Sequence, residues 1–493
     1  MNNIIKTMCF LLLAIGWTGC YEDKGNYDYA MMSKPVVKGI PEKCTAYVNS
    51  RLHIPVTVEW PNGELKNISY EWRVEGKTIS TEKDLDIVVN LDVKPRQYAD
   101  FSIINNETGV REMTLFTIDV TTEFSSGWIA ISQESDCSEM SFIREGDNKL
   151  YKNIYETANG EKLPKGVVQV KEHWIPYGDL TGEIFVGIPT GPNYSLDLDG
   201  SSLKRVVYNK DEFLGNVPED FAPVNMDCVT NWDYIFSNGK LFTRYVERTH
   251  DAQYHEGKFV PVAVPGNYEL SPITLRGNIV SSTDIIAFDL KTKSYQLLRN
   301  GSLKNFNYED DPNKRFNPSN MNKTLISGGA TSTNAPVDKF ITFLKGDDQK
   351  YYVHCFTFTG WGMKSYSSDS EKVFPDASLV KEDSQWAVCK NRPYVYFSSD
   401  NDLYAYNTTG NTVKKLEGCR FDKPIKAIAL NPLDFEQLAV AVENSSDASK
   451  CDFMLLDVSY VGDGKIIEGS RQEAALGNVS KLYYKIGNQW NVF

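Results

Sequence analysis

The chain has 493 residues and carries 52 basic against 65 acidic side chains, which gives a formal net charge of −13. This charge repels polyanions, so nucleic acid is not an expected partner. A hydrophobic fraction of 41%, with 12% aromatic residues, excludes general disorder and is sufficient for large cores in two or more domains.

The N-terminus has the features of a lipoprotein signal peptide. Lys6 precedes an apolar run over residues 9–17, which is too short to cross a bilayer as a helix but has the length of a signal-peptide core. The small residues 18–19 before Cys20 resemble the lipobox of bacterial lipoproteins. We expect the signal peptide, residues 1–19, to be removed and Cys20 to become the lipid attachment site. A buried thiol in an ordinary secretory signal is the alternative.

An acidic pair, Glu22 and Asp23, follows this cysteine and resembles the surface-export signal of Bacteroidota lipoproteins. The resemblance implies a lipid-anchored protein of the outer membrane that faces the cell exterior. Elsewhere the sequence lacks a run of about eighteen apolar residues, so we expect membrane attachment through lipid alone. Residues 20–34 are polar and tyrosine-rich, and they predict a tether.

The other cysteines of the mature chain are odd in number and show no CxxC spacing, which argues against a disulfide framework. Most are expected to behave as small buried hydrophobic residues. One bridged pair in an oxidising compartment is left open. These cysteines are Cys44, Cys137, Cys228, Cys355, Cys389, Cys419 and Cys451.

Residues 35–122 contain short alternating segments separated by turn signals, which predicts an all-β sandwich of the immunoglobulin type. The segment Tyr70 to Lys77 resembles the YxWxxdG strand of PKD and related immunoglobulin-like domains, with Glu75 in place of the usual Asp. Side chains alternate along a strand, so Tyr70 and Trp72 share a face and Trp72 is expected to fill the core.

From residue 125 to 493, pairs of β-rich runs recur about every fifty residues, which predicts radially stacked sheets in a β-propeller. We predict seven blades, with six or eight as alternatives. Residues 482–486 and 490–493 are expected to close the ring by pairing with the first blade. The seven predicted hairpins are 128–132 with 140–144, 166–170 with 183–187, 234–237 with 240–246, 285–290 with 294–298, 340–344 with 351–358, 394–398 with 403–406, and 438–443 with 452–458.

The lipobox, the segment 21–29, the strand 70–77 and the tripeptide 126–128 together resemble the PKD-like surface lipoproteins of gut Bacteroidota. This resemblance implies an accessory protein of a SusC/SusD-type nutrient importer, next to a TonB-dependent transporter and its lidding lipoprotein. The family implies no catalytic residues.

Enzyme signatures such as HExxH, GxSxG and the phosphate-binding loop are missing, so we assign no catalytic residue and no cofactor. His250 and His255 are candidate metal ligands, but they lack helical spacing and a third ligand, and a solvated loop is the simpler interpretation. The pair Asp199 and Gly200 resembles a calcium loop only faintly, and a hairpin turn explains it better. The acidic cluster 309–311 is interpreted as a solvated loop. No metal is therefore predicted.

Aromatic residues among turn residues are the best candidates for ligand binding, because flat rings lose little rotamer entropy on contact with a sugar or peptide. Trp174 and Tyr177 lie in one such segment, and Trp361 and Tyr366 in another. A plug between neighbouring blades is the alternative for each Trp. The stretch 305–327 is a candidate docking surface for a partner protein.

These observations favour a non-catalytic surface lipoprotein that assists a SusC/SusD-type importer in capturing an oligosaccharide or peptide. A surface hydrolase acting on the same nutrient is one alternative, since the 65 acidic residues leave room for a catalytic carboxylate pair that the sequence does not assign. A structural subunit of the importer complex that binds no nutrient is the other.

Overall fold

The computed structural model describes residues 34–173, 182–191, 193–229, 231–246, 257–277, 284–334, 336–360 and 365–487. The chain divides into two compact units, Met1–Thr121 and Thr122–Phe493. The described parts of both are built from strands, with one short α-helix, α2 (Ile154–Asn159), in the second unit. The predicted all-β class is therefore confirmed. Within the described ranges, no helix is long and apolar enough to cross a membrane.

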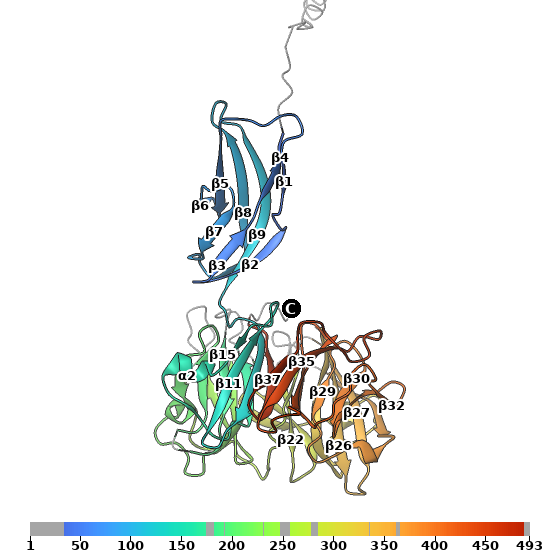
Figure 1. Cartoon of the computed structure of the whole chain (residues 1–493). Helices are drawn as coiled ribbons and strands as arrows, with labels where there is room; N and C mark the ends of the chain where they lie inside the picture. The colour runs from blue at the N-terminus through green and yellow to red at the C-terminus, as the bar shows by residue number, and fades with distance from the viewer. Residues whose placement is uncertain are drawn as a thin grey trace, which may run out of the picture. The chain divides into compact units, whose positions relative to one another are not determined.

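The first unit is a sandwich of short strands (Figure 1). One sheet has the order β2-β9-β8-β5-β6, in which only the β2–β9 pair is parallel, and the pairs β1-β4 and β3-β7 complete the unit. Its strands are β1 (Val36–Lys38), β2 (Lys43–Tyr47), β3 (Arg51–Ile54), β4 (Thr57–Glu59), β5 (Ile68–Val74), β6 (Lys77–Ser80), β7 (Leu85–Val88), β8 (Lys94–Asn105) and β9 (Arg111–Thr121).

The core of this unit forms around Trp72, which is fully buried on β5. Its indole contacts the rings of Phe101 and Phe116 at centroid distances of 4.7 and 5.9 Å. The indole N–H donates a hydrogen bond to the Glu82 carbonyl at 2.9 Å, so the one polar atom of the ring is satisfied. Tyr70 stacks on Phe101 from the same side. The expected core position of Trp72 is confirmed.

The second unit contains seven sheets in its described part. The first consists of β10 (Gly127–Gln133), β11 (Cys137–Arg144), β12 (Leu150–Tyr151), β13 (Leu163–Pro164) and β38 (Val479–Lys485). The second is β14 (Gln169–His173), β15 (Glu183–Gly187), β16 (Leu196–Asp199) and β17 (Arg205–Tyr208), and the third is β18 (Pro223–Val229), β19 (Trp232–Ser237) and β20 (Lys240–Tyr245).

Four further sheets follow in chain order. They are β21 (Leu275–Arg276), β22 (Ile285–Asp289), β23 (Ser294–Arg299) and β24 (Ser302–Asn305); β25 (Lys323–Asn334), β26 (Val337–Gly346), β27 (Tyr351–Thr359) and β28 (Ser365–Val373); β29 (Trp386–Val388), β30 (Tyr394–Ser399), β31 (Asp402–Asn407) and β32 (Thr412–Lys415); and β33 (Ile425–Leu430), β34 (Gln437–Glu443), β35 (Cys451–Asp457), β36 (Lys465–Ile466) and β37 (Gln472–Leu476). Short 3₁₀ turns lie at η1 (Asn209–Glu212), η2 (Tyr308–Asp310) and η3 (Ala377–Leu379).

The sheets neighbour one another in a closed, propeller-like ring. Each of the seven hairpins expected from the sequence forms an antiparallel pair. Contacts between sheets run from β38 to β14, from β14 to β18, from β18 to β22, from β21 to β25, from β25 to β29, from β29 to β33, and from β33 back to β38. The first strand of a sheet therefore lies toward the centre of the ring.

The C-terminal strand closes this ring. β38 pairs with β10 in antiparallel register, with Trp128 opposite Tyr484, so the first sheet combines both ends of the unit. This confirms the expected pairing of residues 482–486, while residues 490–493 lie outside the described chain. Gly487 follows with φ of +78°, and an added Cβ would lie 1.8 Å from the Ser125 carbonyl oxygen, so this position requires glycine.

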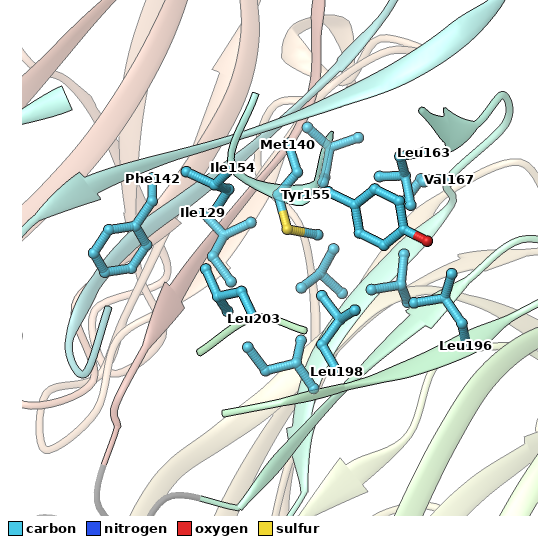
Figure 2. Close-up of a cluster of buried hydrophobic side chains, with 14 of the residues drawn as sticks. Ile129, Met140, Phe142, Ile154, Tyr155, Leu163, Val167, Leu196, Leu198 and Leu203 are labelled. Carbon is cyan, nitrogen blue, oxygen red and sulfur yellow. The ribbon is translucent and has the colours of Figure 1, made fainter. Parts of the chain in front are cut away.

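Apolar side chains fill the space between neighbouring sheets. Figure 2 shows one such cluster, in which Met140 and Ile129 of the first sheet pack with Leu196 and Leu198 of the second. Tyr155 of α2 is buried in the same cluster. No sheet buries both faces alone, so stability of the unit comes from these shared cores.

Candidate functional site

A cavity of about 750 Å³ lies at the centre of the ring. All seven sheets contribute to its wall through their first strands, the segments before them, or β38. Small residues such as Gly328, Gly329 and Ala429 keep the centre open, because they present little side chain to it. The volume lies in the range of pockets that hold small-molecule ligands.

Three lysines, Lys171, Lys390 and Lys481, line this cavity. Burial lowers the pKa of all three ammonium groups. The described wall contains no Asp, Glu, His or Cys. The cavity thus combines a mainly apolar and neutral lining with positive charge.

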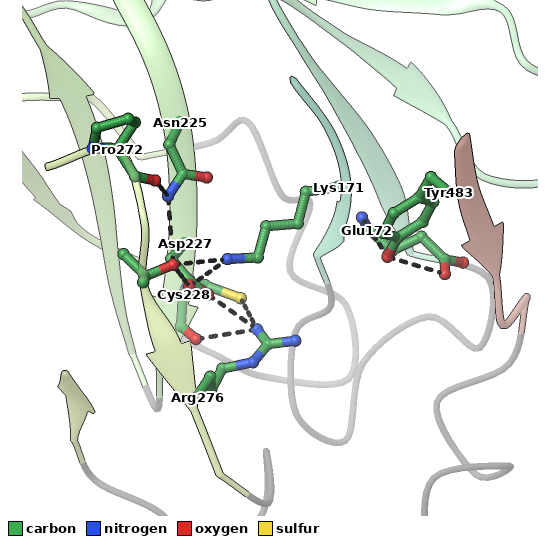
Figure 3. Close-up of polar contacts among 9 residues, drawn as sticks. Lys171, Glu172, Asn225, Asp227, Cys228, Pro272, Arg276 and Tyr483 are labelled. Carbon is green, nitrogen blue, oxygen red and sulfur yellow. Dashed lines mark hydrogen bonds and ion pairs between the residues drawn. The ribbon is translucent and has the colours of Figure 1, made fainter. Parts of the chain in front are cut away.

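Asp227 is a carboxylate beside this cavity that pairs with one of the cavity lysines, Lys171. It forms an ion pair with Lys171, accepts a hydrogen bond from Thr274 Oγ1 at 2.7 Å, and lies 3.2 Å from Arg276 Nη1 (Figure 3). Burial would raise the pKa of Asp227, but Lys171 and Arg276 outweigh it and hold the pKa below its usual value. The network joins β14, β18 and β21, which belong to three different sheets.

Glu172, on β14, forms polar contacts with the C-terminal strand β38 and the residues that follow it. Its carboxylate accepts hydrogen bonds from the backbone N–H of Ile486 at 2.6 Å and of Gly487 at 3.0 Å. Lys485 Nζ lies 3.7 Å away, and the Tyr483 hydroxyl lies beside the carboxylate (Figure 3). Burial raises the pKa of Glu172 and lowers that of Lys485. The pair fixes the end of β38 to the second sheet.

A second buried cluster lies where β14, β15 and β16 meet. His173 Nε2 is 3.7 Å from Glu183 Oε2 and 3.6 Å from Asp197 Oδ1, and all three residues are buried. Imidazole and carboxylate groups are common zinc ligands, and one ligand atom from each lies within 4.8 Å of the others. Burial would lower the pKa of His173, but Asp197 and Glu183 raise it. The raised pKa favours a protonated imidazole, whose charge the two carboxylates balance, so the cluster by itself assigns no metal.

Glu212 extends this cluster toward the third sheet. Asn209 Nδ2 donates to Glu212 Oε2 at 2.7 Å and to Asp197 Oδ2 at 3.0 Å. Arg244 forms an ion pair with Glu212 and a hydrogen bond to Asp233 at 2.7 Å. Burial raises the pKa of Glu212 to about 7, although Arg244 opposes the shift.

Replacing Glu212 with Gln should therefore change the pH dependence of stability. An unfolded Glu titrates near pH 4.3, so between about pH 4 and 7 the folded protein binds more protons at Glu212 than the unfolded chain does. The contribution of Glu212 to wild-type stability therefore falls through this window as pH rises, and Glu212→Gln removes that contribution. In urea unfolding, the variant should gain stability relative to wild type between about pH 5 and 7.5.

The matched control is Glu219→Gln, because Glu219 is an exposed residue of the same unit. Its stability difference from wild type should stay constant over the same pH range. A Glu212→Gln difference that is equally constant would contradict the raised pKa.

The structure places Tyr366 differently from the sequence-based expectation. Tyr366 lies on strand β28 and is only 7% exposed. Its ring packs against Phe306 and Phe358 at centroid distances of 5.0 and 5.6 Å, so it belongs to a core between sheets and not to an open loop. Phe316, in the stretch considered for docking, is likewise buried and stacks on His354 at 3.9 Å.

The remaining predicted site residues lie outside the described chain. These are the lipid attachment site Cys20, the export pair Glu22 and Asp23, the aromatic residues Trp174, Tyr177 and Trp361, and the histidines His250 and His255. Their roles stay predictions.

Two acidic segments are resolved as turns. Asp199 ends β16, and its carboxylate accepts hydrogen bonds from the backbone N–H groups of Ser201 and Ser202, which confirms the hairpin. The solvated-loop interpretation is wrong for Asp311, which is 2% exposed. Its carboxylate accepts from the backbone N–H of Ser368 at 3.1 Å and therefore fastens the turn to β28.

Sequence reasoning missed the central cavity and the charges beside it. A sequence pattern that indicates buried charges was present. Lys171, Glu172 and His173 are consecutive charged or titratable residues at the start of a predicted blade. Asp227 similarly lies between Met226 and Cys228, which are apolar and buried. Charged residues inside apolar strands are uncommon unless paired, and they indicate polar contacts between sheets.

Comparison with known proteins identifies one family match. The model of the PKD-like family matches residues 20–166, so a PKD-like domain is present at the N-terminus. The match extends beyond Thr121 into the first sheet of the second unit. No curated protein sequence matches the chain.

Several solved structures resemble the chain at low similarity. A quinonprotein alcohol dehydrogenase-like protein from Bacteroides thetaiotaomicron is 12% identical, with 92% of this chain and 99% of that chain covered and a TM-score of 0.38. PorZ, a surface component of the type-IX secretion system of Porphyromonas gingivalis, is 11% identical, with 89% and 64% covered and a TM-score of 0.25. A GH74 enzyme from Niastella koreensis is 10% identical, with 75% and 61% covered and a TM-score of 0.25.

Proposed function

We propose that this chain is a non-catalytic cell-surface lipoprotein that assists a SusC/SusD-type TonB-dependent importer in capturing an oligomeric nutrient, either a peptide or a glycan. The central cavity of about 750 Å³ is the observation that carries the binding role. Strands of seven sheets build its wall, so its shape exists before a ligand arrives. Such preorganisation reduces the ordering cost of binding.

The N-terminal sequence supports the proposed location. Glu22 and Asp23 directly follow the lipobox cysteine, Cys20. The PKD-like family model also begins to match at residue 20, the first residue of the expected mature chain. A lipid anchor and a tether would keep both units outside the membrane.

The composition of the cavity supports binding over hydrolysis. Glycoside hydrolysis uses two carboxylates that flank the scissile bond, and general acid–base catalysis most often uses His, Asp or Glu. None of these residue types is found in the described part of the cavity wall. The lysines and apolar residues found there are suited to holding a ligand.

Replacing Cys20 with Ala tests the location. Wild type should incorporate labelled palmitate and be degraded when protease is added to intact cells, because it is lipid-anchored at the exterior. Cys20→Ala should incorporate no palmitate. Wild type that takes up no label, or that intact cells protect from protease, would contradict the proposed location.

Capture is tested with intact cells whose uptake is stopped by an uncoupler. Cells that carry the chain should retain more labelled oligomeric nutrient than cells that lack it, and the retained nutrient should keep its length. Equal retention by both cells would contradict capture. Shortened products formed by the purified protein would instead support the hydrolase alternative.

A further inference from the structure

Two cavity lysines are half-buried without a visible structural reason. Lys390 follows β29 and Lys481 lies on β38, and both side chains line the central cavity. Burial lowers the pKa of both, and no carboxylate of the described chain offsets this effect at either residue. Burial of an ammonium group without a counter-charge costs free energy. A purely structural cavity would gain stability from apolar or neutral residues at these positions.

Positive charge also gathers beside these lysines. The charge of Arg276 adds to the effect of burial and further lowers the pKa of Lys390. Lys171 and Arg276 share the single carboxylate of Asp227. The described centre of the ring is therefore net positive, although the whole chain carries a net charge of −13. This local excess opposes the overall composition.

We propose that the central cavity binds an oxyanion group of its ligand, a carboxylate, sulfate or phosphate, with Lys390 and Lys481 as the charge partners. Ammonium groups act as point charges toward such anions, and their partial burial strengthens the attraction. Gln169 lies in the same wall and provides an amide donor. The inference rests on the proposed function, because it assigns a negative charge to the nutrient that the cavity captures.

Calorimetry on the full-length protein in detergent tests this inference with a matched pair of ligands. Glucuronate differs from glucose only in carrying a carboxylate in place of a hydroxymethyl group. Glucuronate should bind at least about tenfold more tightly than glucose, and its affinity should fall as sodium chloride rises. Titrations with sodium sulfate and with sodium phosphate are carried out in the same way, and the three affinities identify which oxyanion the site prefers.

Variants locate the binding. Lys390→Gln and Lys481→Gln should each weaken binding of the preferred anion by about tenfold or more, since truncating one partner of a partly buried charge pair is costly. Lys304→Gln is the matched control, because Lys304 is an exposed lysine of β24 outside the cavity wall. It should bind as wild type does.

The proposal is overturned if wild type binds glucuronate no better than glucose and ignores sulfate and phosphate. It is also overturned if both cavity variants bind the anion as wild type does. Should the variants misfold, the glucuronate-to-glucose comparison on wild type still decides. Nutrient retention by intact cells is measured separately, so a neutral nutrient captured by the chain would reject only the anion site.

Discussion

Replacing Asp227 with Asn is expected to destabilise the second unit by about 3–5 kcal/mol, because the change leaves two largely buried cations without a counter-charge. Lys171 and Arg276 both pair with this carboxylate, which is fully buried. Since the pKa of Asp227 is lowered, its contribution is complete above the unfolded value of about 3.9 and is lost only as pH falls below it. Urea unfolding at neutral pH measures the loss.

Asp402→Asn is the matched control for this prediction. Asp402 pairs with Lys415 at 2.7 Å, but about a third of each side chain is exposed to solvent. Exposed pairs contribute about 0–1 kcal/mol, so this variant should unfold nearly as wild type does. A small effect of Asp227→Asn, similar to that of the control, would show that the Asp227 network does not hold the sheets together.

Ending the chain after Asn478 is expected to abolish cooperative unfolding of the second unit. This truncation removes β38 and leaves one edge of β10 without its hydrogen-bonding partner. Leu482 and Tyr484 would be lost from the core that joins the first and last sheets. Glu172 would stay buried without its partners Ile486 and Lys485.

A stop codon after Gly487 gives the matched control, because it removes only residues beyond the described chain and keeps β38 complete. Its thermal unfolding, followed by circular dichroism, should resemble that of wild type. Adding a synthetic peptide of residues 479–487 should restore the missing transition to the shorter chain. An unchanged transition in the chain that ends at Asn478 would contradict ring closure by β38.

The hairpins of the ring were predictable because their strands alternate or run continuously with apolar residues between tight turns. The segment Tyr394–Ser399 with Asp402–Asn407 is an example, and its register is that of a short hairpin. Trp72 was also predictable, since the pattern around it places it on the inner face of a strand. In these elements, one continuous segment of sequence contains all the residues that predict the local structure.

The first and outermost strands of the sheets were harder to predict. β25 has the sequence KTLISGGATSTN, which reads as a loop because its small residues face the cavity instead of an apolar core. β28 is polar except for Tyr366 and its last residue, Val373, and preceding glycines made the segment resemble a turn. The strands adopt these positions through tertiary packing, which outweighs local propensity.

The cavity could not be predicted from the sequence, because its wall joins residues that are distant along the chain. Lys171, Lys390 and Lys481 come from three different sheets, and only closure of the ring brings them to one space. Their separate neighbourhoods contain no shared motif. The Asp227 network also joins residues that are distant in the sequence, since Thr274 and Arg276 follow Asp227 by about fifty positions.

We propose that this chain works at the cell surface as part of an importer. Affinity isolation of the tagged chain from detergent-solubilised outer membranes tests it most directly, with Cys20→Ala as the matched control. The account predicts that wild type recovers a TonB-dependent transporter and its SusD-type lipoprotein in comparable amounts, and that Cys20→Ala recovers neither. Recovery of the wild-type chain alone, under conditions that keep the transporter and its lipoprotein together, would contradict the account.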